Sequence, residues 1–226
     1  MKLLLPIVVI TCSLLLIGCT NTEGTLAIGG KVLDEYTKEG IPKRAVIIQG
    51  LISSDSKFIP TDDIGHFYTD SSGHFTHTLK KTKNAYWYNF IFVGDSTYPY
   101  STKMISLDEL ERNSKFISFY LDKLTDLTIK IERSNKSLPD DTLFISWKTN
   151  DSDGKLYPYK VINFGIAPYL EFRCIGGNVK SQIETKTFAN KNTIVYMYLF
   201  RKGGVKEMSD TIYCIRDAKN YFNFKY

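Results

Sequence analysis

The sequence has few of the residues on which most enzyme and metal sites depend. It contains three histidines, four cysteines and two tryptophans among its 226 residues. The cysteines and histidines do not occur at the paired spacing that is typical of a zinc site. We find no serine nucleophile motif, no His–Cys pair that can be placed, and no carboxylate spacing that marks a glycosidase. We therefore expect a protein that is not an enzyme and that uses no metal or cofactor.

Long apolar runs are also absent beyond the first residues, so we expect no membrane-spanning helix in the rest of the chain. The one such run, Leu3–Leu16, follows Lys2 and leads to Ile17-Gly18-Cys19. It has the length of a signal-peptide core and falls short of the roughly 20 apolar residues that a spanning helix needs. With a small residue directly before Cys19, the segment resembles the lipobox of bacterial lipoproteins. The alternative is an ordinary signal peptide followed by an incidental cysteine.

The resemblance to lipoproteins implies a location at a membrane. Residues 1–18 would be removed, the Cys19 thiol would be lipidated, and residues 19–25 would form a short polar tether. Acyl chains contribute about 0.8 kcal/mol per buried methylene, so several chains anchor a protein to a membrane durably. Thr20, not aspartate, follows the cysteine. This favours the outer membrane if the source has two membranes.

The net charge of +5 is scattered along the chain. One dense basic cluster stands out, Lys80-Lys81-Thr82-Lys83. Such a cluster either contacts an acidic polymer or lipid, or is a solvated turn. No motif indicates nucleic-acid binding, and an exported protein is in the wrong compartment for it.

Short segments rich in β-branched and aromatic residues, separated by Gly, Asp, Ser and Asn, predict an all-β protein. Their spacing favours two antiparallel β-sandwich domains, over residues 26–122 and 126–226. A capping-box pattern predicts one short helix from Ser106 to Asn113. Lys202-Gly203-Gly204-Val205 predicts a tight hairpin. The expected strands are Ala27–Leu33, Ala45–Leu51, Phe75–Leu79, Tyr86–Val93, Phe116–Leu121, Leu127–Glu132, Leu143–Lys148, Leu156–Val161, Tyr169–Ile175, Ile194–Arg201 and Thr211–Ile215.

Three motifs in the first half occur in a familiar order. They are Ile28-Gly29-Gly30-Lys31-Val32-Leu33-Asp34, Gly40-Ile41-Pro42 and Thr69-Asp70-Ser71-Ser72-Gly73-His74-Phe75. Together they resemble the carboxypeptidase regulatory-like domain family. The resemblance implies a transthyretin-like or immunoglobulin-like sandwich of about seven strands, with no catalytic residues. Lys43-Arg44 departs from the family pattern, and a polar insertion, Ser53–Ile64, is expected to widen a loop.

Several aromatic side chains are candidates for a ligand surface. In the segment Tyr86–Val93, strand alternation puts Tyr86, Tyr88, Phe90 and Phe92 on one face and Trp87, Ile91 and Val93 on the other. Both faces are apolar, so the segment is either a central strand covered on both sides or an exposed aromatic surface. Stacking on sugar rings would suit Trp87, Trp147, Tyr157 and Tyr159, and core packing is the alternative for each.

The two cysteines of the second half, Cys174 and Cys214, both lie in expected strands. In an exported protein such a pair can oxidise, and we predict a disulfide; two buried free thiols are the alternative.

The clusters of histidine and aspartate predict exposed turns and strand positions more than metal sites. The histidines His66, His74 and His77 lie close in sequence, but the odd spacing of the last two sends them to opposite faces of a strand. Asp62, Asp63 and Asp70 could bind calcium, but a solvated loop is the favoured interpretation. Asn150–Gly154 is interpreted as a turn, because the EF-hand pattern fails at both ends of this segment.

These observations favour a non-enzymatic, lipid-anchored envelope protein that binds or scaffolds other envelope proteins. A surface glycan-binding lipoprotein is the alternative.

Overall fold

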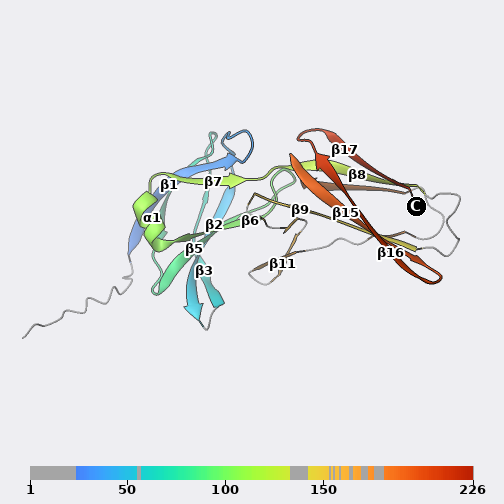
Figure 1. The fold of residues 1–226 in the computed structure, drawn as a ribbon. Helices are drawn as coiled ribbons and strands as arrows, with labels where there is room; N and C mark the ends of the chain where they lie inside the picture. The colour runs from blue at the N-terminus through green and yellow to red at the C-terminus, as the bar shows by residue number, and fades with distance from the viewer. Residues whose placement is uncertain are drawn as a thin grey trace, which may run out of the picture.

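The computed structural model describes residues 24–54, 57–132, 142–152, 154, 156–157, 159–162, 165–168, 173–175 and 181–225. These residues form seventeen strands and one short helix (Figure 1). The fold is all-β, as predicted, and consists of β-sandwiches. Across the ranges described, we find no helix of the length and apolarity that a membrane crossing requires.

The N-terminal sandwich pairs a three-stranded sheet with a four-stranded sheet. The first sheet has the order β4 (His74–Lys80), β1 (Thr25–Asp34), β7 (Ile117–Leu121). The second has the order β3 (Lys57–Tyr68), β2 (Ala45–Ser54), β5 (Ala85–Phe92), β6 (Ser101–Ser106). Helix α1 (Leu107–Asn113) connects β6 to β7.

The C-terminal sandwich is built from the strands after Leu124. One sheet has the order β14 (Ser181–Phe188), β8 (Leu124–Glu132), β17 (Lys219–Lys225). The other runs from β9 (Thr142–Asn150) through β15 (Lys191–Arg201) to β16 (Gly204–Cys214), with β10 (Leu156–Tyr157) and β13 (Arg173–Ile175) also pairing with β9. A separate ribbon joins β11 (Tyr159–Ile162) to β12 (Gly165–Pro168).

The two sandwiches have the same strand order. In each, the first strand lies between a middle strand, with which it pairs antiparallel, and the last strand, with which it pairs parallel. In the N-terminal sandwich β2 lies between β3 and β5, and β6 follows β5; in the C-terminal sandwich β9 lies between β10 and β15, and β16 follows β15. The parallel pairs, β1·β7 and β8·β17, differ from the purely antiparallel sheets that we predicted. They arise because the last strand returns beside the first and closes the three-stranded sheet.

Each sandwich encloses its own apolar core. The N-terminal core draws on β1, β2, β3, β4, β5, β7 and α1. The C-terminal core draws on β8, β9, β14, β15, β16 and β17. Among the residues that the structure describes, none belongs to both cores.

Local signals in the sequence produced the expected turns. The Asp70 carboxylate accepts hydrogen bonds from the amides of Ser72 and His74, and Gly73 has a φ of +80°. The Ser106 hydroxyl caps α1 by accepting from the amide of Glu109 at 3.2 Å. These contacts satisfy backbone donors that would otherwise lack partners.

Two expectations about the N-terminal sandwich need correction. The polar insertion Ser53–Ile64 does not widen a loop, because it extends β2 and β3, which pair with shifts of register at Gln49. Tyr86 does not share the buried face of Tyr88, because a bulge opposite β2 turns it outward, and its side chain is 55% exposed. The segment is central within its sheet, since β5 lies between β2 and β6, but it is not covered on both sides, because Trp87 is 38% exposed.

Candidate functional site

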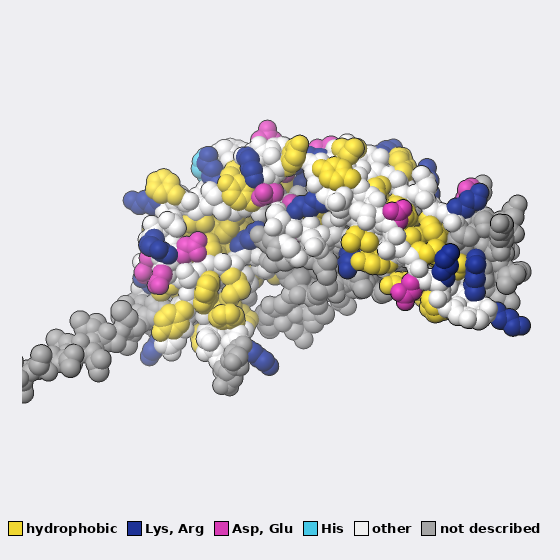
Figure 2. All heavy atoms as spheres, viewed as in Figure 1, with side chains coloured by type: hydrophobic (Ala, Val, Ile, Leu, Met, Phe, Trp, Pro, Cys, Tyr) yellow, Lys and Arg dark blue, Asp and Glu magenta, His cyan; other side chains and the backbone are white. Residues whose placement is uncertain are grey.

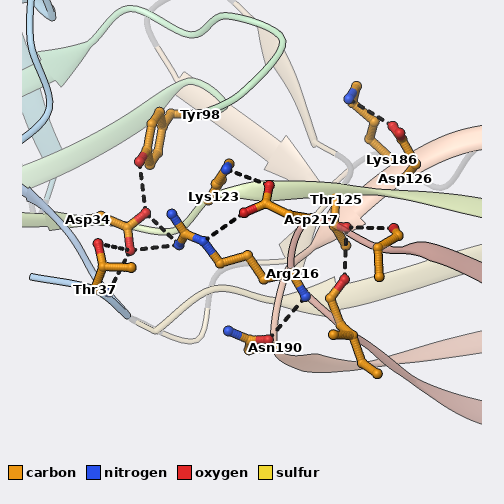
Figure 3. A network of polar contacts seen from close by, with 12 residues as sticks. Asp34, Thr37, Tyr98, Lys123, Thr125, Asp126, Lys186, Asn190, Arg216 and Asp217 are labelled. Atoms are coloured by element: carbon orange, nitrogen blue, oxygen red, sulfur yellow. Dashed lines mark hydrogen bonds and ion pairs between the residues drawn. The ribbon is translucent and has the colours of Figure 1, made fainter. Parts of the chain in front are cut away.

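A polar network joins the two sandwiches (Figure 3). Its centre is a two-pronged ion pair in which Arg216 Nη1 lies 2.8 Å from both carboxylate oxygens of Asp34. Asp34 is the last residue of β1, whereas Arg216 lies in the turn between β16 and β17. The side chain of Asp34 is 3% exposed, so the pair is shielded from solvent on the carboxylate side. One nitrogen thus contacts both oxygens, and such charge-assisted contacts are roughly twice as strong as hydrogen bonds between neutral groups.

The carboxylate of Asp34 uses its remaining acceptor positions within its own sandwich. The Tyr98 hydroxyl donates to Oδ2 at 2.7 Å, and the amides of Tyr36 and Thr37 donate to Oδ1 at 2.9 Å. Burial alone would raise the pKa of Asp34, but the bonds from Thr37, Arg216 and Tyr98 outweigh it and hold the pKa below its usual value. Asp34 is therefore an ionised, fully engaged acceptor at neutral pH.

A second arginine, Arg44, positions Tyr98. Arg44 is 5% exposed and donates to Asp95 Oδ2 at 2.8 Å and to the Val93 carbonyl at 2.6 Å. The other oxygen of Asp95 accepts from the amide of Tyr98 at 2.8 Å. The guanidinium of Arg44 also lies 5.2 Å from the centre of the Tyr98 ring. The contacts thus run without a break from the interior of the N-terminal sandwich to Arg216.

On the C-terminal side the same turn is braced by further contacts. Asp217 pairs with Lys123 at 2.6 Å and with Arg216 Nε at 3.3 Å. The Asn190 side chain accepts from the backbone amide of Arg216 at 3.1 Å. Asn220 accepts from the amide of Ile215 at 2.7 Å. The guanidinium is therefore presented to Asp34 from a backbone that is itself held in place.

A second contact crosses the junction at Asp122. Its Oδ1 lies 3.1 Å from Lys191 Nζ, and its Oδ2 accepts from the amide of Ser152 at 2.7 Å. The amide of Leu124 donates to the Thr97 carbonyl at 2.7 Å. These bonds immobilise the connection between β7 and β8. The network offers no unengaged nucleophile, and its chemistry is that of a structural clamp.

The aromatic candidates separate into different environments. Trp147 is fully buried in the C-terminal core, so the prediction that it stacks on a ligand is wrong; its strand β9 is covered by the opposite sheet. Tyr157 is half-buried and packs against the Phe188 ring at 5.0 Å between ring centres. Trp87 is 38% exposed, with the Phe58 ring 6.3 Å away. Tyr159 lies in β11, and its side chain is outside the described part.

The predicted disulfide is wrong. Cys214 is a buried free thiol, and its Sγ lies 3.6 Å from the Thr193 hydroxyl. The backbone of Cys174 lies in β13, three strands away from β16, which separates them by about 14 Å at the usual strand spacing. A disulfide requires α-carbons within about 7 Å. Sequence could not reveal this, because the separation depends on which strands pair.

The polar clusters are turns and strand surfaces. Among the residues described, no three or more His, Cys, Asp or Glu side chains are grouped so that they could hold a metal ion. Asp63 accepts from the Gln49 side chain at 3.0 Å across the strands β2 and β3. His77 packs against the Phe67 ring, 5.6 Å between ring centres, and its Nε2 is buried without a hydrogen-bond partner. Residues 1–18 and Cys19 lie outside the described part of the chain.

The clamp was not predicted from the sequence. Asp34 is the acidic last residue of the first strand motif, and this position alone does not indicate an ion pair. Arg216 lies 182 positions further along the chain, and no local pattern marks it as a partner. The strand periodicity shows which residues face a core but does not show which sheet ends meet.

Comparisons with known proteins yield similarity of structure alone. No family model matches the chain, and no curated protein matches it. The shaft pilin SpaA from Lactobacillus rhamnosus GG is similar over 90% of this chain and 98% of its own, with 10% identity and a TM-score of 0.32. The minor pilin GBS52 of Streptococcus agalactiae aligns over 88% and 94%, with 12% identity and a TM-score of 0.39. A putative cell adhesion protein from Bacteroides ovatus aligns over 90% and 92%, with 9% identity and a TM-score of 0.27.

Proposed function

We propose that the chain is a lipid-anchored protein of the cell envelope that acts as a non-enzymatic binding or scaffolding accessory to other envelope proteins. The proposed location is supported by the apolar segment that leads to Gly18-Cys19. The chain's mechanical role rests on the Asp34–Arg216 clamp, which ties one sandwich to the other. A tether of a few residues followed by two clamped sandwiches suits a protein that presents a surface at a set height above a membrane. The outer membrane is the proposed location if the source has two.

The anchor is tested by replacing Cys19 with Ser in cells that make the full chain. We expect the wild-type protein to fractionate with membranes and its first mature residue to carry the mass of acyl groups. The C19S variant should lose that mass and appear in the soluble fraction. A wild-type protein without added acyl mass would contradict the anchor.

The scaffolding role is tested by crosslinking the tagged lipoprotein in living cells. We expect one envelope protein to dominate the captured material and to be lost when Asp34→Asn and Arg216→Gln loosen the clamp. The matched control is Lys186→Gln, which removes an exposed ion pair within the C-terminal sandwich. Captured material that is unchanged when the clamp is loosened would contradict the role of a fixed geometry.

Glycan binding remains the second candidate because Trp87 and Phe58 are both partly exposed and lie edge to face. Exposed aromatic rings bind the apolar faces of sugars. Trp87→Ala should then abolish a change in intrinsic fluorescence on adding polysaccharide. Fluorescence that stays constant across a broad polysaccharide panel would remove this candidate.

A further inference from the structure

The basic turn Lys80–Lys83 lies at the end of the N-terminal sandwich where the described chain begins. The amide of Lys81 donates to the carbonyl of Gly24 at 2.7 Å, and Thr25 pairs with Lys80 across β1 and β4. Only four residues separate Gly24 from Cys19, and an extended chain covers at most about 18 Å from one to the other. If Cys19 is lipidated, this end of the molecule therefore stays close to the membrane surface.

The connection between β6 and β7 brings more cations to the same end. Lys81 Nζ pairs with Glu111 Oε1 of α1 at 2.6 Å, which joins the basic turn to the helix. The amide of Gly29 donates to the Ser114 carbonyl at 2.6 Å, so the following Lys115 and Phe116 lie beside the first half of β1, the half nearer Gly24. Phe116 is 85% exposed, which is unusual for a phenylalanine.

The charges at this end favour an anionic partner. The cations are Lys80, Lys81, Lys83, Arg112 and Lys115, and the carboxylates of α1 are Asp108, Glu109 and Glu111. Five cations against three carboxylates leave an excess of two positive charges. Lys80, Lys83 and Lys115 are exposed. Figure 2 shows basic, acidic and hydrophobic side chains together on the left end of the molecule, where α1 lies in Figure 1.

The repeated topology supports a docking role for this end. In the C-terminal sandwich, the turn between β14 and β15 donates from the amide of Ala189 to the Lys123 carbonyl at 2.9 Å, just as Lys81 donates to Gly24. The connection between β16 and β17 carries Arg216, which docks on Asp34. The matching end of the N-terminal sandwich carries the basic turn, Lys115 and Phe116. Each sandwich thus carries cations at the end where its own first strand begins. In the C-terminal sandwich these cations face the N-terminal sandwich, which precedes it in the chain.

We infer that this end, formed by Lys80, Lys83, Lys115 and Phe116, docks on the anionic phospholipid headgroups of the membrane that holds the anchor. The lysines neutralise headgroup charge, and the Phe116 ring enters the interface. Docking would set the tilt of the molecule relative to the membrane, which acyl chains alone do not set. This inference rests on the proposed lipid anchor for its orientation.

The test uses the mature chain, residues 19–226 with Cys19→Ser, which contains every residue that the structure describes. Binding is measured by co-sedimentation with phosphatidylcholine vesicles that contain or lack 30% phosphatidylglycerol. We expect preference for the anionic vesicles, weakened by added salt. Replacing Lys80, Lys83 and Lys115 with Gln should weaken binding about a hundredfold, since each surface lysine contributes about a factor of five. Phe116→Ser should weaken it about tenfold.

The control is a variant with the same loss of charge at the far end of the C-terminal sandwich, K202Q/K206Q/K225Q, which should bind as the wild type does. Circular dichroism verifies that each variant is folded. Equal binding to neutral and anionic vesicles, or equal loss in the control variant, would overturn the inference. Because the chain used carries no lipid, a failure of the anchor in cells leaves this result unaffected, and the two proposals can fail separately.

Discussion

The two sandwiches share one strand order but fill their cores differently. In the N-terminal sandwich the Phe119 ring lies 4.8 Å from that of Phe90 and 5.0 Å from that of Phe92, at the centre of an aromatic cluster. The C-terminal core is mainly aliphatic around Trp147 and includes a buried hydroxyl pair, Thr187 and Thr193, at 2.6 Å. The shared topology therefore depends on the alternation of inward and outward positions, and the same order tolerates different core chemistry.

The connections differ more than the sheets. In the N-terminal sandwich α1 joins β6 to the last strand, β7, whereas in the C-terminal sandwich a tight turn joins β16 to the last strand, β17. That turn positions Arg216 to reach the preceding sandwich, so a difference in a loop produces the clamp. Connections with different roles on a common scaffold are a general feature of β-sandwiches.

The largest expected effect comes from breaking one core at a time. Phe119→Ala and Trp147→Ala should each cost about 3–5 kcal/mol of unfolding free energy, because each leaves a large cavity. If the sandwiches fold independently, each variant lowers one thermal transition in calorimetry and leaves the other nearly unchanged. A single transition that shifts equally in both variants would show that the two cores unfold together.

A smaller effect is expected from the close approach of β1 and β7. A β-carbon on Gly30 would lie 1.8 Å from the carbonyl oxygen of Ile117, and this backbone atom cannot move aside without separating the strands. Gly30→Ala should cost about 3 kcal/mol in the N-terminal sandwich. Gly29→Ala is the matched control, since its nearest backbone atom is 3.3 Å away. Urea unfolding of both variants measures the difference, and equal stabilities would contradict the packing described.

Next in size is the clamp. In a double-mutant cycle of Asp34→Asn and Arg216→Gln, we expect a coupling of about 2 kcal/mol, typical of a hydrogen bond to a charged group. The depressed pKa of Asp34 predicts that this contribution is present above the usual carboxyl pKa and is lost as the pH falls through the lower folded value. Unfolding measured from pH 7 downward should show the coupling unchanged to about pH 4. A coupling that disappears near pH 6 would contradict this assignment.

The smallest effect concerns His77. Burial and the neighbouring His66 lower its pKa, so the folded protein favours the neutral ring. The unfolded chain binds the proton more readily, and stability should therefore fall as the pH drops from about 6.5 toward the folded pKa. His77→Asn should remove this slope, whereas the exposed His74→Asn should retain it. Slopes that are equal in the two variants would contradict the burial argument.

Much of the secondary structure follows from local patterns, and the long-range contacts do not. The cap at Ser106, the Asp70 turn and the hairpin at Gly203 each depend on neighbouring residues, and the structure contains all three. Strand β3 and the exposed side chain of Tyr86 were not predicted, because both depend on irregular pairing with the neighbouring strand β2. The clamp was not predicted because the ends of two sheets must meet before Asp34 and Arg216 become neighbours. Composition cannot distinguish a buried Trp147 from an exposed Trp87, since both lie in strands of alternating pattern.

The central claim is that the clamp holds the two sandwiches in one relative orientation. It is tested most directly by pulsed electron spin resonance between labels at Thr76→Cys and Lys206→Cys, with Cys19 and Cys174 replaced by Ser and the buried Cys214 retained. We expect a single narrow distance distribution for the otherwise wild-type chain, which broadens when Asp34→Asn and Arg216→Gln remove the clamp. A distribution that is already broad with the clamp intact would contradict the account.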